Sequence, residues 1–138
     1  MAAETFVDTS GFYAVLVKRD DQHEKASDLM RKAAEQRARF ITTDYVLDET
    51  ATLLKARGHT HLLKTFFDGA VQSAACRVEW TDSDRFIETM SFFLKYADHG
   101  WSFTDCLSFR VMKSLRLQQA LTKDSHFQEA GFSALLKA

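Results

Sequence analysis

The sequence has no proline, only two cysteines and five glycines, and no excess of charge of either sign. Without proline, the ends of helices and strands must be set by glycine and by capping side chains. Two thiols, Cys76 and Cys106, are too few for a disulfide scaffold, and we expect both to be reduced and buried. A net charge of −1 gives no support for tight, non-specific binding of nucleic acid, which usually needs a strongly basic protein.

Long apolar runs are also missing. None approaches the roughly 18 residues that cross a bilayer, and the N-terminus, MAAETFVDTS, lacks the basic and apolar regions of a secretion signal. We therefore expect a cytoplasmic protein with no membrane contact. The hydrophobic share of 46% and the charged share of 27% are typical of globular proteins, and the length predicts a single domain over residues 1–138.

Short apolar runs alternate with longer stretches of helical periodicity. Strands are predicted at residues 5–7, 40–41, 77–80, 119–122 and 132–135. Helices are predicted at 10–17, 23–39, from the cap candidates 42–44 to 57, and then at 59–75, 83–96, 104–115 and 125–128. The caps would be Thr9 or Ser10 for the first of these helices and Thr104 for the sixth. This alternation predicts βαβ units and a parallel sheet between layers of helices.

Four acidic residues fall at or near one edge of this predicted sheet. Asp8 ends the first strand, and Asp124 lies just past the fourth. Asp105 sits in the first turn of its helix, and Glu49 lies about two turns into the helix after the second strand. Ligand sites of open α/β sheets lie outside the carboxyl ends of the strands, so we expect these carboxylates to gather there.

Carboxylates that converge repel one another and need protons or cations to neutralise them. Oxygen ligands suit Mg²⁺ and Mn²⁺, and such ions activate water for phosphodiester cleavage. Any one of these acids taken alone is better explained as a helix cap or a partner of the helix dipole. With 19 acidic residues in the chain, spacing alone is a moderate signal for a metal site.

The residues around the acids add a resemblance to a known family. The segment FVDTS at residues 6–10 resembles the opening motif of the PIN-domain nucleases, and TDYVLDET at 43–50 resembles their second motif. WSFTDCLS at 101–108 resembles the third, and ALTKDSHF at 120–127, followed by AGF at 130–132, resembles the fourth. All four motifs occur in order between about residues 5 and 136, which makes the resemblance specific.

The resemblance implies a three-layer α/β/α PIN-like fold with a short-stranded, mainly parallel sheet. It implies a Mg²⁺- or Mn²⁺-dependent endoribonuclease that cleaves single-stranded RNA with a metal-activated water. The residues implied to bind metal and to be catalytic are Asp8, Glu49, Asp105 and Asp124; Thr9, Ser10 and Thr104 would orient these carboxylates. Asp48 lies beside Glu49, and Glu49 is assigned from the motif rather than from physics.

Within the family, the length of the chain and the residues of its motifs are similar to those of the VapC-type toxins of toxin–antitoxin pairs. This implies a small antitoxin protein as inhibitor, RNA as substrate and a homodimer. Three alternatives stay open: a non-catalytic binding module on the same fold, a nuclease without an antitoxin, and DNA as substrate. A phosphatase using Asp8 as a covalent nucleophile is disfavoured, since that chemistry usually has a second Asp where Ser10 stands.

Several other signals have simpler explanations. Lys55 and Arg57 end a predicted helix, where basic residues interact favourably with the helix dipole, although they are also placed to steer phosphates. His59 and His61 are two residues apart and do not share a helix face, so we do not predict a metal site there. His126 is expected to pack or to cap a turn. The basic residues between 31 and 39 are expected to form a solvated helix face.

Overall fold

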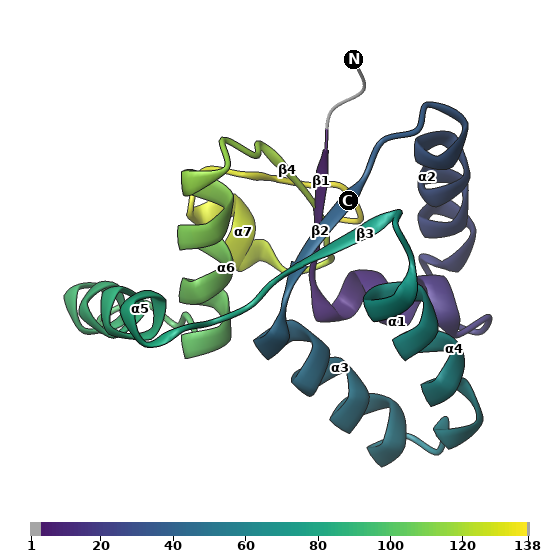
Figure 1. The fold of residues 1–138 in the computed structure, drawn as a ribbon, viewed down its shortest axis with the longest axis horizontal. Coiled ribbons are helices and arrows are strands. Elements are labelled where there is room, and N and C mark those ends of the chain that lie inside the picture. The colour runs from purple at the N-terminus through teal and green to yellow at the C-terminus, as the bar shows by residue number, and fades with distance from the viewer. Residues whose placement is uncertain (1–3, 138) are drawn as a thin grey trace.

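The structure, a computed structural model, describes residues 4–137 as a five-stranded sheet between two layers of helices (Figure 1). The strands are β1 (Thr5–Val7), β2 (Phe40–Thr43), β3 (Cys76–Glu79), β4 (Gln119–Leu121) and β5 (Ser133–Ala134). They lie in the order β3-β2-β1-β4-β5, and every neighbouring pair is parallel. The predicted three-layer α/β/α fold is confirmed, and its sheet is parallel throughout.

Seven α-helices accompany the strands in the described residues: α1 (Thr9–Leu16), α2 (His23–Glu35), α3 (Asp44–Ala56), α4 (Leu63–Phe67), α5 (Ser83–Lys95), α6 (Phe103–Ser114) and α7 (Ser125–Glu129). In Figure 1, α1, α2 and α4 lie on one side of the sheet and α5, α6 and α7 on the other, while α3 leads away from the end of β2. Among residues 4–137, no helix is both long and apolar enough to cross a membrane.

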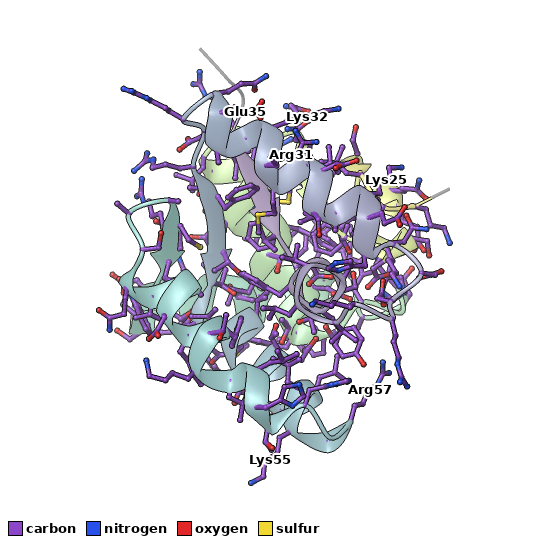
Figure 2. All side chains as sticks on the ribbon, turned by 90° about the vertical axis from the view of Figure 1, so that its right-hand side faces the viewer. Lys25, Arg31, Lys32, Glu35, Lys55 and Arg57 are labelled. Carbon is purple, nitrogen blue, oxygen red and sulfur yellow. The ribbon has the colours of Figure 1, made fainter. Side chains whose placement is uncertain are left out.

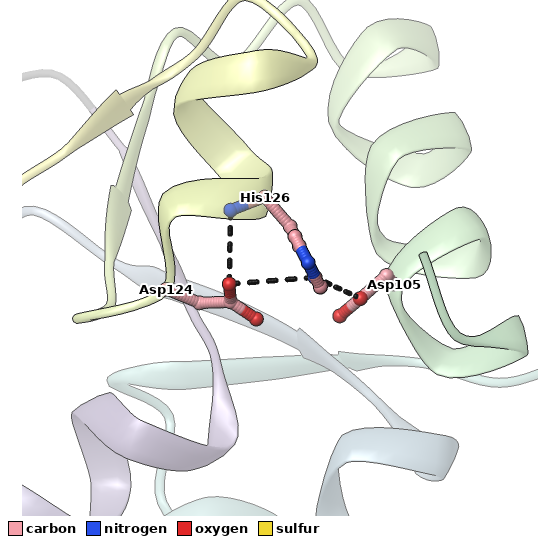
Figure 3. Close-up of side chains that lie close together, drawn as sticks. All are labelled: Asp105, Asp124 and His126. Atoms are coloured by element: carbon pink, nitrogen blue, oxygen red, sulfur yellow. Dashed lines mark hydrogen bonds and ion pairs between the residues drawn. The ribbon is translucent and has the colours of Figure 1, made fainter. Parts of the chain in front are cut away.

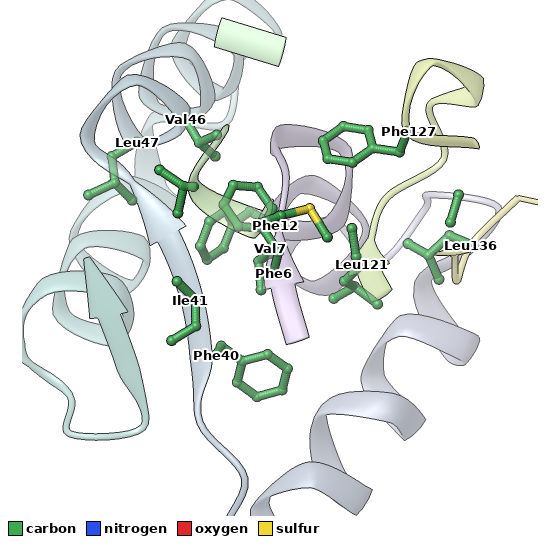
Figure 4. Close-up of a cluster of buried hydrophobic side chains, with 14 of the residues drawn as sticks. Phe6, Val7, Phe12, Phe40, Ile41, Val46, Leu47, Leu121, Phe127 and Leu136 are labelled. Atoms are coloured by element: carbon green, nitrogen blue, oxygen red, sulfur yellow. The ribbon is translucent and has the colours of Figure 1, made fainter. Parts of the chain in front are cut away.

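The core is centred on β1, the middle strand of the sheet. Phe6 and Val7 are fully buried because helices cover both faces of the strand, which explains why the strand is apolar without alternation. Ile41 of β2 and Leu121 of β4 lie beside them, and Phe127 of α7 closes the cluster (Figure 4). The two chain segments that carry the first and fourth acidic motifs are thus fixed against one another by the best-buried part of the molecule.

Four helix ends share one backbone motif. At Arg37, Gly58, Arg116 and Gly131 the chain has a positive φ angle, and the next residue donates a backbone hydrogen bond five residues back, as Ala38 does to Ala33. This motif usually has glycine at the left-handed position. The predicted end at Gly58 is therefore confirmed, whereas the prediction that the second helix reaches Arg39 was wrong, because the turn at Arg37 ends it at Glu35.

Two further predictions were wrong in detail. The segment predicted as one helix at 59–75 consists of a 3₁₀ turn (Thr60–Leu62), α4 and a π-helical turn (Asp68–Gln72). Gly69 lies in the π turn, and glycine weakens a regular helix at an interior position. The helix cap positions also moved: Asp8 rather than Thr9 or Ser10 precedes α1, and Ser102 rather than Thr104 caps α6.

Candidate metal centre at the carboxyl edge of the sheet

The order of the strands reverses between β1 and β4. β2 and β3 follow on one side of β1, whereas β4 and β5 lie on the other. Such a switch point leaves a crevice at the carboxyl ends of the two strands, where ligands of open α/β proteins bind. Val7 pairs with Leu121 in the parallel register, so Asp8 and Thr122 directly follow the two strands side by side.

Asp8 is the most deeply buried acid of the site, with 6% of its surface exposed. Its Oδ2 accepts a hydrogen bond of 2.9 Å from the Thr122 hydroxyl. Burial raises the pKa of Asp8 to about 7, against the opposing effect of this hydrogen bond, and the nearby charges of Asp105 and Asp124 add to the rise. The folded protein therefore holds a proton on this carboxyl to a higher pH than an exposed Asp does, unless a cation replaces that proton.

Asp105 is held by the first turn of α6. Its backbone N–H donates to the Ser102 hydroxyl at 3.0 Å, and its Oδ2 accepts from the Ser102 backbone N–H at 3.1 Å, which together form a capping box. The sequence places Asp105 correctly in the first turn, but the capping hydroxyl lies two residues before the predicted Thr104. Burial raises the pKa of Asp105, although the hydrogen bonds from Ser102 and His126 oppose this effect.

Asp124 and His126 complete this side of the cluster (Figure 3). Asp124 caps α7, since its Oδ1 accepts from the His126 backbone N–H at 2.9 Å. The Nδ1 of His126 lies 3.0 Å from Oδ2 of Asp105 and 3.4 Å from Oδ1 of Asp124. Burial alone lowers the pKa of His126, but the hydrogen bond to Asp105 and the charges of both carboxylates raise it overall.

His126 links two of the predicted acids instead of only packing or capping a turn, a role that was not predicted from the sequence. Its spacing of two residues from Asp124 is the signal that was available. Asp105, Asp124 and His126 each offer a ligand atom, and these atoms lie within 4.8 Å of one another. They form the group of described residues most closely spaced for a metal ion.

Glu49 enters the site from α3. Its side chain is exposed, and its Oε1 accepts a hydrogen bond of 3.1 Å from the Thr9 hydroxyl on α1. A hollow of about 340 Å³ is lined by Asp8, Glu49 and Asp124 together with Thr9 and Ser10. The structure therefore brings together three of the predicted acids around one hollow, and Asp105 joins them through its contact with His126.

Hydroxyl groups connect the carboxylates to the backbone. The Ser10 Oγ lies 3.1 Å from the Thr122 Oγ1 and accepts from the Lys123 backbone N–H at 2.8 Å. Thr122 in turn donates to Asp8, so this residue orients an acid although sequence analysis did not select it. Thr104 was selected; its carbonyl accepts from Ser108 at 2.9 Å, and a role for its hydroxyl remains a prediction.

The donor set fits a hard divalent cation. The charges of Asp105 and Asp124 raise the pKa of Asp8, and the charge of Asp124 raises that of Asp105, so the folded protein holds negative charge at a cost that a cation would relieve. Carboxylate oxygens are the usual ligands of Mg²⁺ and Mn²⁺, and one imidazole nitrogen is compatible with Mn²⁺. The residues present thus suit the kind of ion that the sequence predicts.

Comparison with known proteins agrees with this geometry. The family model for the PIN domain matches residues 5–133. The 23S rRNA-specific endonuclease VapC20 of Mycobacterium tuberculosis is 33% identical over 129 residues, which cover 92% of this chain and 94% of that protein. A VapC ribonuclease of Archaeoglobus fulgidus is 28% identical over 123 residues, covering 88% of this chain and 77% of the relative.

Solved structures give the same result. The crystal structure of Mycobacterium tuberculosis VapC20, described as a sarcin-ricin loop cleaving toxin, superposes with a TM-score of 0.82 at 30% identity. The match covers 93% of this chain and 95% of that one. PAE2754 from Pyrobaculum aerophilum superposes with a TM-score of 0.65 at 18% identity, covering 98% and 91% of the two chains, and this second likeness concerns the fold alone.

Proposed function

Because this chain belongs to the PIN-domain family and is of its VapC type, we propose that it cleaves single-stranded RNA as a Mg²⁺- or Mn²⁺-dependent endoribonuclease. We propose further that residues 1–138 form one nuclease domain. RNA is the proposed substrate because two relatives are named as an rRNA endonuclease and a ribonuclease. The acids alone would serve cleavage of DNA equally well, so DNA belongs among the substrates to be tested.

The proposed metal ligands are Asp8, Asp105 and Asp124, with Glu49 binding directly or through a water molecule. When bound, a divalent cation supplies Lewis-acid activation of water and stabilises the charge that builds on the phosphate. The chain's own contribution is to hold the ligands. Thr122 fixes one oxygen of Asp8, and Thr9 fixes one oxygen of Glu49. Burial of Asp8 excludes water from the side of the site that faces the sheet.

One observation carries the proposal: four acids that are far apart in the sequence meet at the switch point of the sheet. The most buried of them has a pKa raised to about 7. A buried carboxyl with a raised pKa does not stabilise the folded protein when it ionises. Acids whose pKa is shifted in this way, and which line a hollow, are typical of functional sites. A non-catalytic module would have no need to retain the set.

The test is cleavage of labelled single-stranded RNA and DNA by the purified protein, with Mg²⁺ or Mn²⁺ in one arm and EDTA in the other. Glu49→Gln is the informative variant, because Glu49 is exposed and its replacement should not disturb folding. Asp48→Asn is its matched control, since Asp48 is the neighbouring exposed acid on α3. We expect RNA cleavage that needs metal and Glu49 and that persists in Asp48→Asn.

Cleavage that survives in EDTA, or equal losses in the two variants, would refute the metal site. Absence of cleavage, together with absence of Mn²⁺ binding by calorimetry, would favour the non-catalytic binding module.

We propose a small antitoxin protein as inhibitor, as the VapC type implies, and a homodimer. An exposed apolar face on α5, formed by Phe86, Ile87, Met90 and Leu94, supports the homodimer, since a monomer would leave it in water. Light scattering during size-exclusion chromatography tests this directly. A dimer that Leu94→Glu converts to a monomer supports the proposal, whereas a monomeric wild-type protein contradicts it.

A further inference from the structure

A second and larger hollow adjoins the acidic one. Its volume is about 940 Å³, and it shares Tyr13, Asp20 and Arg57 with the hollow that contains the acids. It continues to Lys18 and Arg19 in the turn after α1 and, on the other side, to the segment 59–62. We call it the Tyr13 hollow. Anything bound in it would lie next to the carboxylates.

Helical periodicity explains why the two hollows are continuous. Glu49, Leu53 and Arg57 are spaced four residues apart, so they share one face of α3 and the start of the turn after it. Thr9 and Tyr13 have the same spacing on α1, which packs against α3. Eight residues of helix measure about 12 Å, so Arg57 lies roughly that far from Glu49 along the same groove.

The side chains of the Tyr13 hollow combine flat aromatic surface with a guanidinium group. The Arg57 guanidinium lies over the Tyr13 ring at 5.1 Å from its centre. The His59 ring meets Tyr13 edge-on at 5.7 Å, and its Nε2 lies 3.2 Å from the Tyr13 hydroxyl. His61 follows at 6.0 Å from His59. Stacked aromatic rings and guanidinium planes are the surfaces on which proteins hold unpaired bases.

The charge of this hollow also favours a polyanion. Lys123 is occupied by ion pairs with Asp20 and Asp21 at 2.8 and 2.5 Å. By contrast, no ion pair within residues 4–137 involves Lys18, Arg19 or Arg57, and all three are exposed.

Figure 2 shows Arg57 at the far end of α3, well away from Arg31 and Lys32 on α2. Arg31 is paired with Asp28 and Glu35.

We propose that the Tyr13 hollow binds the unpaired nucleotides of the RNA strand beside the phosphate that is cut. Arg57 would contact a backbone phosphate, and Tyr13 with His59 would provide the stacking surface for a base. The proposal rests on the proposed function, because it assigns the substrate path of the same site. It also favours, for Arg57, the contact with phosphates over the interaction with the helix dipole, which was the simpler explanation from the sequence.

The test measures binding separately from cleavage. A short fluorescein-labelled single-stranded RNA is titrated with protein carrying Glu49→Gln, in Mg²⁺, and binding is followed by fluorescence anisotropy at several salt concentrations. Arg57→Gln is added to this background in one sample and Lys55→Gln in another. Lys55 is an exposed cation on the same helix that lines neither hollow, so the two changes are matched in charge and side-chain size.

We expect Arg57→Gln to weaken binding about ten-fold and to reduce the slope of log K against log salt by about 0.7, as loss of one phosphate contact predicts. Lys55→Gln should change the affinity less than about two-fold. Tyr13→Leu should weaken binding about five-fold or more through lost stacking, whereas Tyr13→Phe should not. Thermal melting of each variant checks that the fold is intact.

Equal effects of Arg57→Gln and Lys55→Gln would overturn the proposal, as would equal affinities of Tyr13→Leu and Tyr13→Phe. Ultraviolet crosslinking of a thiouridine-containing RNA gives a second measurement, and crosslinks that avoid the peptides containing Tyr13 and His59 would also overturn it. Wild-type cleavage is recorded in parallel. RNA binding that needs Arg57 without any cleavage would refute the proposed nuclease while supporting this binding site. Cleavage together with RNA binding that does not need Arg57 would support the nuclease and refute this binding site.

Discussion

Replacing Asp8 by asparagine is expected to make the metal-free protein more stable while abolishing its cleavage of RNA. The folded protein holds the Asp8 carboxyl with a pKa of about 7, above the ordinary value of 3.8, chiefly because the side chain is buried. The folded state therefore binds this proton more tightly than the unfolded chain does. The contribution of the protonated carboxyl to the free energy of unfolding is fully present below about pH 4, and it is lost as the pH rises through about 7.

The size of the effect follows from the same two values. The difference between 3.8 and about 7 corresponds to roughly 4 kcal/mol of unfolding free energy once the carboxyl is fully ionised. Asparagine has nearly the same shape, stays neutral and keeps an oxygen to accept the hydrogen bond from Thr122. At pH 8 the variant should therefore melt up to roughly 14 °C above the wild type, and at pH 4 the two should melt together.

The assay is a series of thermal melts from pH 4 to pH 8.5 in EDTA, with Asp48→Asn as the control for loss of one exposed carboxylate. A second series with Mn²⁺ should raise the melting temperature of the wild type more than that of Asp8→Asn, because the wild type binds the ion more tightly. If Asp8→Asn melts at or below the wild type at pH 8 in EDTA, the carboxyl is not held at a cost in the folded state and the reasoning fails.

Two other variants test separate parts of the site, and a third tests the packing of α1 against β4. Glu49→Gln should lower RNA cleavage at least about 100-fold in a single-turnover assay while leaving the melting temperature nearly unchanged, since the side chain is exposed; a large loss of stability would contradict this. Thr122→Val removes the hydrogen bond to Asp8 and should weaken Mn²⁺ binding about 10-fold by calorimetry, and unchanged affinity would refute an orienting role. Gly11→Ala places a Cβ 2.0 Å from the Leu121 carbonyl oxygen, so it should cost at least about 2 kcal/mol in urea unfolding, and a wild-type midpoint would show that α1 can move away from β4.

Much of the fold was predictable because the strands are short and the three central ones, β1, β2 and β4, are largely buried. Their positions agree with the apolar runs to within two residues. Whether a helix end could be predicted depends on which residue has the left-handed conformation there. Gly58 signals its left-handed turn in the sequence, whereas Arg37 and Arg116 adopt the same conformation at positions where arginine gives no such signal. The hydrogen bonds back into the helix select that conformation, and single-residue propensity does not reveal them.

The four proposed acids were also found from the sequence, from their positions after strands and from the family motifs. The groups that orient them were found only in part. Thr122 acts on Asp8 across 114 positions of sequence, a contact that requires knowledge that β4 lies beside β1. The Tyr13 hollow depends in the same way on α1 packing against α3. These contacts depend on which distant elements of the chain lie side by side, and this cannot be predicted from the local sequence.

The position of β4 beside β1 also governs when the site can exist during synthesis. Asp8 is synthesised 114 residues before its hydrogen-bond partner Thr122 and also before the acid Asp124, and parallel pairing over such a separation forms slowly. Until β4 pairs with β1, Leu121 cannot cover Phe6 and Val7, and that side of the central strand stays open. A nascent chain that does not yet include β4 therefore leaves one edge of an apolar strand uncovered and lacks Asp124, and the pairing of β4 with β1 supplies both.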